Sequence, residues 1–272
     1  ISACLVGSEM CIRDRAEAAR GAGVRFAGSQ QHRDQRFLLR PADARALRRL
    51  GQRNAGRFLF RGQGTALHHP YPRLDDVAMP IANFFASGPL QLGAKLGPIL
   101  WQFPPSMAFD EERFTEFLDL LPKDTEQALR QARQADRQHD GSLEVPHHQK
   151  LRHAVEIRHA SFLDPAFIKL LRKHKVALVF ADSAGKWPYA EDLTADFVYL
   201  RLHGNKKLYE SGYDEDAIDH WHQRIATWSR GQQPGDARLV DSRKPRTRAS
   251  RDVYCYFCLL YTSDAADDSL RV

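Results

Sequence analysis

The sequence predicts an α/β fold built on a parallel sheet, and three observations lead to this prediction. A short, nearly continuous apolar run, 99–103, lies between Gly97-Pro98 and Pro104-Pro105 in the stretch LGPILWQFPPS. A run that is apolar on both faces and bounded by breakers is typical of a buried strand in a parallel sheet. Similar runs recur toward the C-terminus, and stretches with helical spacing separate most of them. Alternating strands and helices are the pattern of a parallel sheet covered by helices.

Between residues 73 and 257 the elements follow one another in a readable order. Helical spacing of apolar residues predicts a helix over 75–87 and another through Phe114 and Leu121, with Asp110 as its expected N-cap. The polar stretch 123–140 is also expected to be helical. Two further helices are expected over 165–174 and 214–228, the latter with Ile218, Trp221, Ile225 and Trp228 inward. Strands are expected at 97–103, 153–158, 176–182, 196–203 and 252–257.

The two ends of the chain do not read as protein. Residues 1–15 and 258–272 resemble translated sequencing adapter, a contaminant of metagenomic sequences, and they are therefore left out of the fold prediction. Three of the four cysteines lie in these ends, so Cys255 alone remains. A single cysteine without metal-ligand spacing offers no case for disulfides and is expected of a reducing cytoplasm.

Residues 16–72 read as the N-terminal part of the same domain in a shifted reading frame. Taken one base over, Gln31–Leu39 can encode SIEINGSFY, and Phe58–Tyr71 can encode FSFAVKGPRYITHT in the same frame. Both strings alternate as strands do. The hypothesis is that one indel upstream shifted the frame and a second, near Arg73, restored it.

The expected strands then add up to a closed barrel. Five are visible in frame, two lie in the shifted segment, and one is expected to be missing upstream. Eight strands alternating with helices predict a TIM-like (β/α)8 barrel whose N-terminal strands are corrupted or absent in this sequence.

Five spaced motifs carry a family resemblance. LGPILWQFPP, HAVEIRHASF, ALVFADSAG, DFVYLRLHG and RDVYCYF resemble, in this order, motifs of the YecE-like family, known as domain of unknown function 72. The shifted strings resemble the two preceding motifs of that family. The resemblance implies a TIM-like barrel over 73–257 and a family without an established reaction. The family's Gly-Trp-rich opening motif is absent, and adapter-like sequence stands in place of the Asn-rich segment after YCYF.

The charge distribution bears on the expected partners. The chain has a net charge of +6, but residues 20–72 carry +9 and the remainder −3, so the basic character belongs to the shifted segment. Binding to nucleic acid is therefore not supported. No apolar run approaches the ~18 residues of a membrane span, and no membrane association is expected.

Polar residues at the ends of the expected strands are the candidate site, because a barrel builds its site at the carboxyl ends of its strands. Glu156 and His159 are the candidates for general acid and base. The candidates for ligand binding are Gln102, Arg158, Asp182, Arg201 and His203. Glu156 needs a partner if it faces the barrel, and Arg201 is the expected one; a purely structural ion pair is the alternative. His147, His148 and His153 are expected to be solvated.

Three functions remain open on the sequence alone. The first is a hydrolase or lyase acting on a phosphorylated or carboxylated compound that Arg158 and Arg201 hold. The second is a barrel that binds a small molecule without catalysis. The third is a metal-dependent phosphodiesterase, in which Glu156, His159, Asp182 and His203 would hold a divalent ion, although no spacing indicates a metal or any other cofactor.

Overall fold

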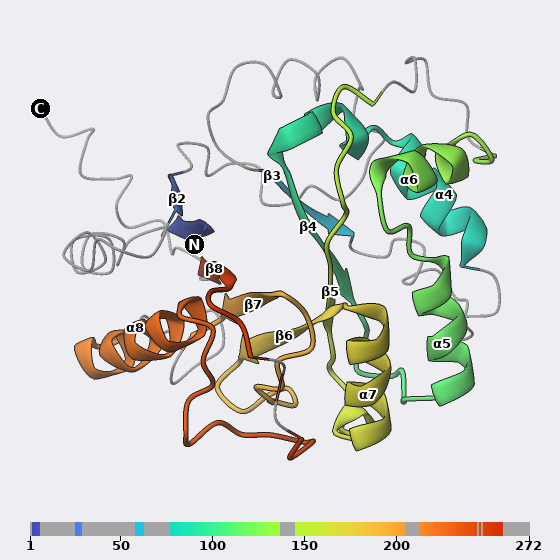
Figure 1. Ribbon diagram of the computed structural model, residues 1–272. Coiled ribbons are helices and arrows are strands. Elements are labelled where there is room, and N and C mark those ends of the chain that lie inside the picture. The colour runs from blue at the N-terminus through green and yellow to red at the C-terminus, as the bar shows by residue number, and fades with distance from the viewer. Residues whose placement is uncertain are drawn as a thin grey trace, which may run out of the picture.

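The computed structural model describes residues 77–136, 145–204, 213–243, 245 and 247–257, together with three short strands nearer the N-terminus (Figure 1). All described strands belong to one parallel sheet with the order β2-β1-β8-β7-β6-β5-β4-β3. The strands are β1 (Ser2–Leu5), β2 (Arg25–Gly28), β3 (Phe58–Gly62), β4 (Leu96–Gln102), β5 (His153–Glu156), β6 (Ala177–Asp182), β7 (Phe197–Leu202) and β8 (Asp252–Phe257).

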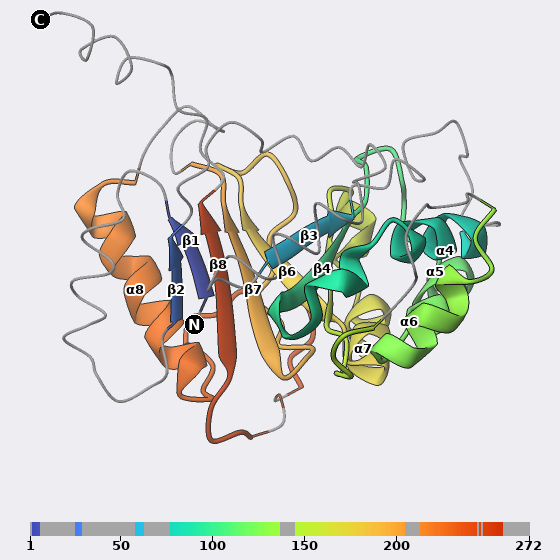
Figure 2. The same ribbon diagram turned by 90° about the horizontal axis from the view of Figure 1, so that it is seen from above.

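Helices connect the strands and cover one face of the sheet, as Figure 2 shows. They are α4 (Ala78–Ala86), α5 (Glu111–Leu120), α6 (Thr125–Ala132), α7 (Pro165–His174) and α8 (Glu215–Ser229), with the 3-10 helices η1 (Pro89–Lys95) and η2 (Ala160–Phe162). The predicted N-cap of α5 is confirmed, because the Asp110 side chain accepts a hydrogen bond from the backbone N–H of Arg113. The four predicted inward residues of α8 are buried.

The sheet has two apolar faces because side chains alternate along each strand. One set packs against the helices and includes Trp101 and Phe103, whose rings contact Phe117. The other set lies on the opposite face, which is the inner face of the curved sheet. The members of this inner set are Leu100, Ala154, Ala177, Val179, Ala181, Phe197, Tyr199 and Tyr254.

A side-chain contact shows how strongly the sheet curves. Arg152, just before β5, donates to the hydroxyl of Tyr254 on β8 over 2.9 Å and to Asp252 over 2.6 Å. Three steps between strands span ~14 Å in a flat sheet. The side chains of Arg152 and Tyr254 reach toward each other over this distance on the inner face, and curling of the sheet from β5 to β8 brings them together. Strands β4–β8 form a curled half-barrel, and closure into the predicted eight-stranded barrel would need pairing of β2 with β3, which the described strands do not show.

The five strands predicted in frame are all present, each with bounds close to those expected. Two expectations need correction, and one element is additional. The helix predicted over 123–140 ends at Ala132, and residues 137–140 lie outside the described part. Helix η1 was not predicted. His153, expected to be solvated, is buried at the start of β5, where Trp101 Nε1 donates to its Nδ1 and its Nε2 bonds the carbonyl of Pro122.

The N-terminal predictions are only partly within the described residues. Strand β1 lies in the segment set aside as adapter-like, and it pairs with β8 and β2. Strand β3 lies at the start of the second shifted string, whereas Gln31–Leu39 and residues 63–71 lie outside the described part. The reading frame and the origin of both ends stay predictions. No described helix is both long and apolar enough to cross a membrane.

Candidate functional site

Three of the predicted residues meet on the inner face at the carboxyl ends of their strands. Gln102, Glu156 and Arg201 each lie two residues after a member of the inner apolar set, so the strand period places their side chains on the same face. Gln102 and Glu156 are also direct partners in the register of β4 and β5. On β4, β5 and β7 the apolar residues of the inner face are thus followed by a polar residue. These three polar residues lie together at the carboxyl edge of the sheet, which we call the rim.

Glu156 is the centre of this group, and it is completely buried. One carboxylate oxygen accepts a hydrogen bond from Nη1 of Arg201, and the other accepts from Nε of Arg158 over 3.1 Å. The expected partnership of Glu156 with Arg201 is thus confirmed, and Arg158 is a second partner. The contact joins β5 to β7 across the inner face.

Gln102 ties the two arginines together from the other side. Its side-chain oxygen accepts from Nη2 of Arg158 over 2.8 Å and from Nη1 of Arg201 over 3.3 Å. The contact to Arg201 reaches from β4 to β7. Both guanidinium groups therefore lie between a carboxylate and an amide oxygen, which fixes their planes.

The charges of this group do not cancel. Burial alone raises the pKa of Glu156, but the guanidinium groups of Arg201 and Arg158, with a smaller contribution from His203, hold that pKa below its usual value. Glu156 is therefore ionised at neutral pH. Among the described residues, one carboxylate faces two permanently charged guanidinium groups, so these three described side chains carry a surplus of positive charge.

Trp187 extends the site beyond the strands. The guanidinium of Arg158 lies over the indole ring, 4.8 Å from its centre, which is a cation–π contact. Trp187 belongs to the loop between β6 and β7, and the sequence prediction missed it. An aromatic residue in a Ser-Ala-Gly-Lys turn directly after a strand end was the signal that could have identified it.

His203 lies beside the group, whereas Asp182 lies apart from it. His203 follows β7, shares the inner-face alternation of Arg201 and is fully buried. Asp182 lies two residues after Phe180 on β6, so its side chain is on the helix-facing side of the sheet. There it accepts a hydrogen bond from the Tyr213 hydroxyl over 2.8 Å. Burial is the main reason that the pKa of Asp182 is raised.

His159 makes local contacts at the start of η2. It caps η2, where its Nδ1 accepts from the backbone N–H of Ser161 over 3.2 Å and lies 2.8 Å from the Ser161 hydroxyl. Among the described residues, no three His, Cys, Asp or Glu side chains come together in a group that could hold a metal ion. The four residues considered for a divalent ion are therefore not assembled in the described part.

Comparisons with known proteins agree with this architecture. The sequence model described as "Protein of unknown function DUF72" matches residues 40–269. A search of curated proteins found no match. The structure is similar to that of a DUF72 family protein of Thermotoga maritima MSB8, with a TM-score of 0.55 and 20% identity, over 81% of this chain and 74% of that one.

A DUF72 family protein of Enterococcus faecalis V583 is also similar, with a TM-score of 0.41 and 13% identity, over 84% of this chain and 92% of that one. At 20% identity the Thermotoga maritima structure bears on the fold alone. The match of the family model covers most of the sequence, including the five motifs that carried the resemblance. The chain belongs to the DUF72 family, in which the YecE-like proteins are grouped.

Proposed function

We propose that this protein binds a small phosphorylated or carboxylated compound at the rim formed by Gln102, Glu156, Arg158 and Arg201, and acts on it as a hydrolase or lyase. One observation carries the proposal: the guanidinium groups of Arg201, which is buried, and of Arg158, which is partly buried, share the carboxylate of Glu156. The side chains of Arg158 and Arg201 are only 14% and 5% exposed. Two guanidinium groups held this close repel each other where water screens them little, and an anionic ligand between them would lower that repulsion.

The position supports the proposal as well. The group lies at the carboxyl ends of parallel strands, where α/β proteins build their sites. The strand order is that of an eight-stranded barrel opened between β2 and β3. We also propose that β2 and β3 pair and close the barrel. The rim would then lie at the open carboxyl end of the closed barrel. A cytoplasmic location belongs to the proposal, because Cys255 is the single cysteine between the two adapter-like ends.

The contacts suggest a division of roles. Arg158 and Arg201 would hold the anion by charge-assisted hydrogen bonds, with Gln102 fixing their planes. Both oxygens of Glu156 accept from guanidinium groups. We therefore assign Glu156 a positioning role in place of the acid or base role expected from the sequence. His159, at the start of η2, and His203 are the side chains proposed to carry protons.

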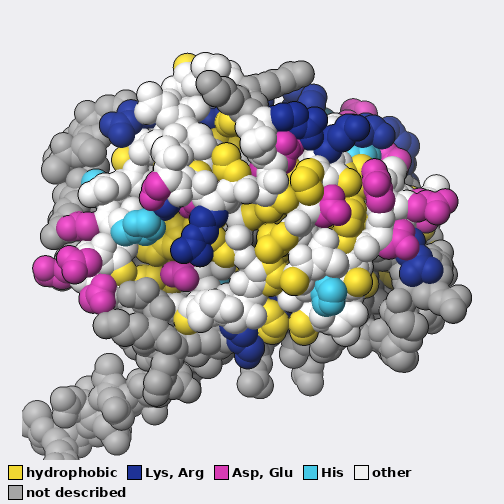
Figure 3. Space-filling model, turned by 90° about the horizontal axis from the view of Figure 1, so that it is seen from below, with side chains coloured by type: hydrophobic (Ala, Val, Ile, Leu, Met, Phe, Trp, Pro, Cys, Tyr) yellow, Lys and Arg dark blue, Asp and Glu magenta, His cyan; other side chains and the backbone are white. Residues whose placement is uncertain are grey.

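A binding protein without catalysis is the second candidate. The observation that favours it is the same fixed carboxylate, because an ionised Glu156 bound to two arginines is a poor general acid. A panel of phosphorylated and carboxylated compounds incubated with the protein separates the two candidates. An enzyme would release inorganic phosphate or consume the carboxylated compound, whereas a binding protein would leave both unchanged. Nucleic acid is not proposed as a partner, and the face in Figure 3 shows basic side chains interspersed with acidic and apolar ones.

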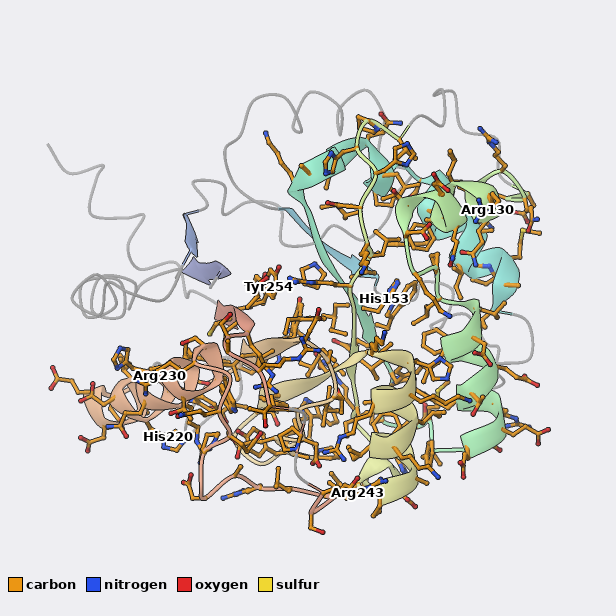
Figure 4. All side chains as sticks on the ribbon, in the orientation of Figure 1. Arg130, His153, His220, Arg230, Arg243 and Tyr254 are labelled. Atoms are coloured by element: carbon orange, nitrogen blue, oxygen red, sulfur yellow. The ribbon has the colours of Figure 1, made fainter. Side chains whose placement is uncertain are left out.

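The experiment that tests the proposal is calorimetric titration of the protein with inorganic phosphate and with small carboxylates. We expect saturable binding to the wild type, and a loss of about tenfold or more in affinity for Arg158→Gln, since a charge-assisted contact is removed. Arg130→Gln is the matched control, because Arg130 is exposed on α6 at the periphery of the molecule (Figure 4). Equal binding by both variants would contradict the proposal.

A further inference from the structure

We propose that the turn Ser183–Trp187 makes the rim selective for a doubly charged anion, namely the terminal phosphate of a phosphate monoester. This inference rests on the anion site proposed above and names its substrate class. The turn directly follows β6, so it lies at the carboxyl side of the sheet, beside the end of β5 that carries Arg158.

The turn is held in a defined shape. The Ser183 hydroxyl accepts from the backbone N–H of Trp187 over 2.9 Å, and the Ser183 carbonyl accepts from the backbone N–H of Lys186 over 3.0 Å. Ala184 and Gly185 adopt left-handed conformations, with φ of 50° and 78°. Ser183 itself is buried. The position of Trp187 is thus fixed by hydrogen bonds from the backbone N–H groups of Lys186 and Trp187 to Ser183.

Two cations lie against the same indole ring. The guanidinium of Arg158 is 4.8 Å from the centre of the Trp187 ring, and the ammonium of Lys186 is 5.1 Å from it. The two positive charges therefore lie within about one Debye length of each other, close enough to act on one ligand. The face of the indole ring carries negative charge density, which reduces the cost of keeping them together.

The charge balance at the rim now indicates the ligand. Arg158, Arg201 and Lys186 are three cations, and among the described residues Glu156 is the carboxylate that pairs with Arg158 and Arg201. Asp182, next to the turn, bonds to Tyr213 on the helix side of the sheet. A phosphate monoester carries nearly two negative charges at neutral pH because its second pKa is about 6. A carboxylate or a phosphodiester carries only one.

Three ligands with the same phenyl body test the inference by calorimetric titration of the full chain. They are phenyl phosphate, methyl phenyl phosphate and benzoate. We expect phenyl phosphate to bind about tenfold more tightly than the other two at about pH 7.5, and to lose this advantage as the pH falls below about 6. Lys186→Gln is expected to reduce the advantage to about threefold or less, with little change for benzoate.

Two further variants complete the design. Trp187→Leu removes the ring that holds both cations and is expected to reduce the advantage as Lys186→Gln does, whereas Trp187→Phe retains it in part. Lys173→Gln is the matched control, because Lys173 is exposed in the last turn of α7, near the amino ends of the strands. Circular dichroism melts establish that each variant is folded.

The outcomes separate this inference from the proposed function. If none of the ligands binds, both fail. If all three bind with equal affinity, or if Lys186→Gln keeps the full preference for phenyl phosphate, the anion site stands and the selectivity of the turn is refuted.

Discussion

Replacing the central carboxylate is predicted to destabilise the protein more than replacing one of its arginines. Glu156→Gln leaves two buried guanidinium groups without their carboxylate. Arg201→Gln leaves Glu156 paired with Arg158 at 3.1 Å, one charge against one. Breaking a buried pair by removing one partner costs ~3–5 kcal/mol. We expect roughly 4 kcal/mol for Glu156→Gln and about half as much for Arg201→Gln, because the second pair remains.

The assay is urea unfolding followed by circular dichroism, with and without saturating phosphate. A difference of roughly 2 kcal/mol corresponds to ~4–8 °C in Tm. Phosphate is expected to stabilise Glu156→Gln more than the wild type, because an anion that binds the folded state replaces the missing carboxylate. The double variant Glu156→Gln/Arg201→Gln should lose less than the sum of the single variants, since the residues are in contact.

The reasoning is refuted if Arg201→Gln is the more destabilised variant and phosphate stabilises both variants equally. That result would mean that the two arginines are compensated by some other group, and that the positive surplus at the rim does not exist.

Three further predictions concern other parts of the molecule. Burial lowers the pKa of His153 to about 4, so between about pH 6.5 and 4 the unfolded chain takes up a proton that the folded chain cannot. The free energy of unfolding should therefore fall by up to ~3 kcal/mol across this window, and His153→Gln should not show this fall. Glu156 contributes a separate loss only below about pH 4.5, because its folded pKa is lowered. Asp110→Ala should cost ~1 kcal/mol in urea unfolding through loss of the α5 cap, and an unchanged midpoint would contradict the cap. Nucleotide sequencing should show codons for SIEINGSFY and FSFAVKGPRYITHT one base over from Gln31–Leu39 and Phe58–Tyr71, and any other codons would refute the frame hypothesis.

The strands and helices could be predicted because their signals are local. The run around Trp101 is bounded by Gly-Pro and Pro-Pro, and helix α7 was predicted with its observed bounds, Pro165–His174, because a proline follows an Asp cap and apolar residues keep the helical period. Helix η1 could not be predicted in the same way. It is a seven-residue 3-10 segment with a kink at Gly93, and such short segments lack a sustained period.

The site was predictable only as far as the strand ends go. Gln102, Glu156 and Arg201 are found by counting along strands, because alternation decides which face a side chain takes. Asp182 also ends a strand but has the opposite alternation, and its carboxylate bonds to Tyr213 instead. The burial of His153 depends on a contact with Trp101, far away in the sequence, and leaves no pattern in the residues around it. Trp187 is signalled only by its place in the turn after a strand end, and its contact with Arg158 again joins distant segments.

The side-chain contacts across the inner face bear on the order in which the sheet forms while the chain is being synthesised. Pairing of β4 with β5 and of β5 with β6 needs only neighbouring parts of the chain, but the contacts of Gln102 with Arg201 and of Arg152 with Tyr254 span 99 and 102 residues. A nascent chain that ends before β7 has neither contact, and its Glu156 has no Arg201. Curvature of the sheet and assembly of the rim therefore belong to the same late step, when the last strands leave the ribosome and join the sheet.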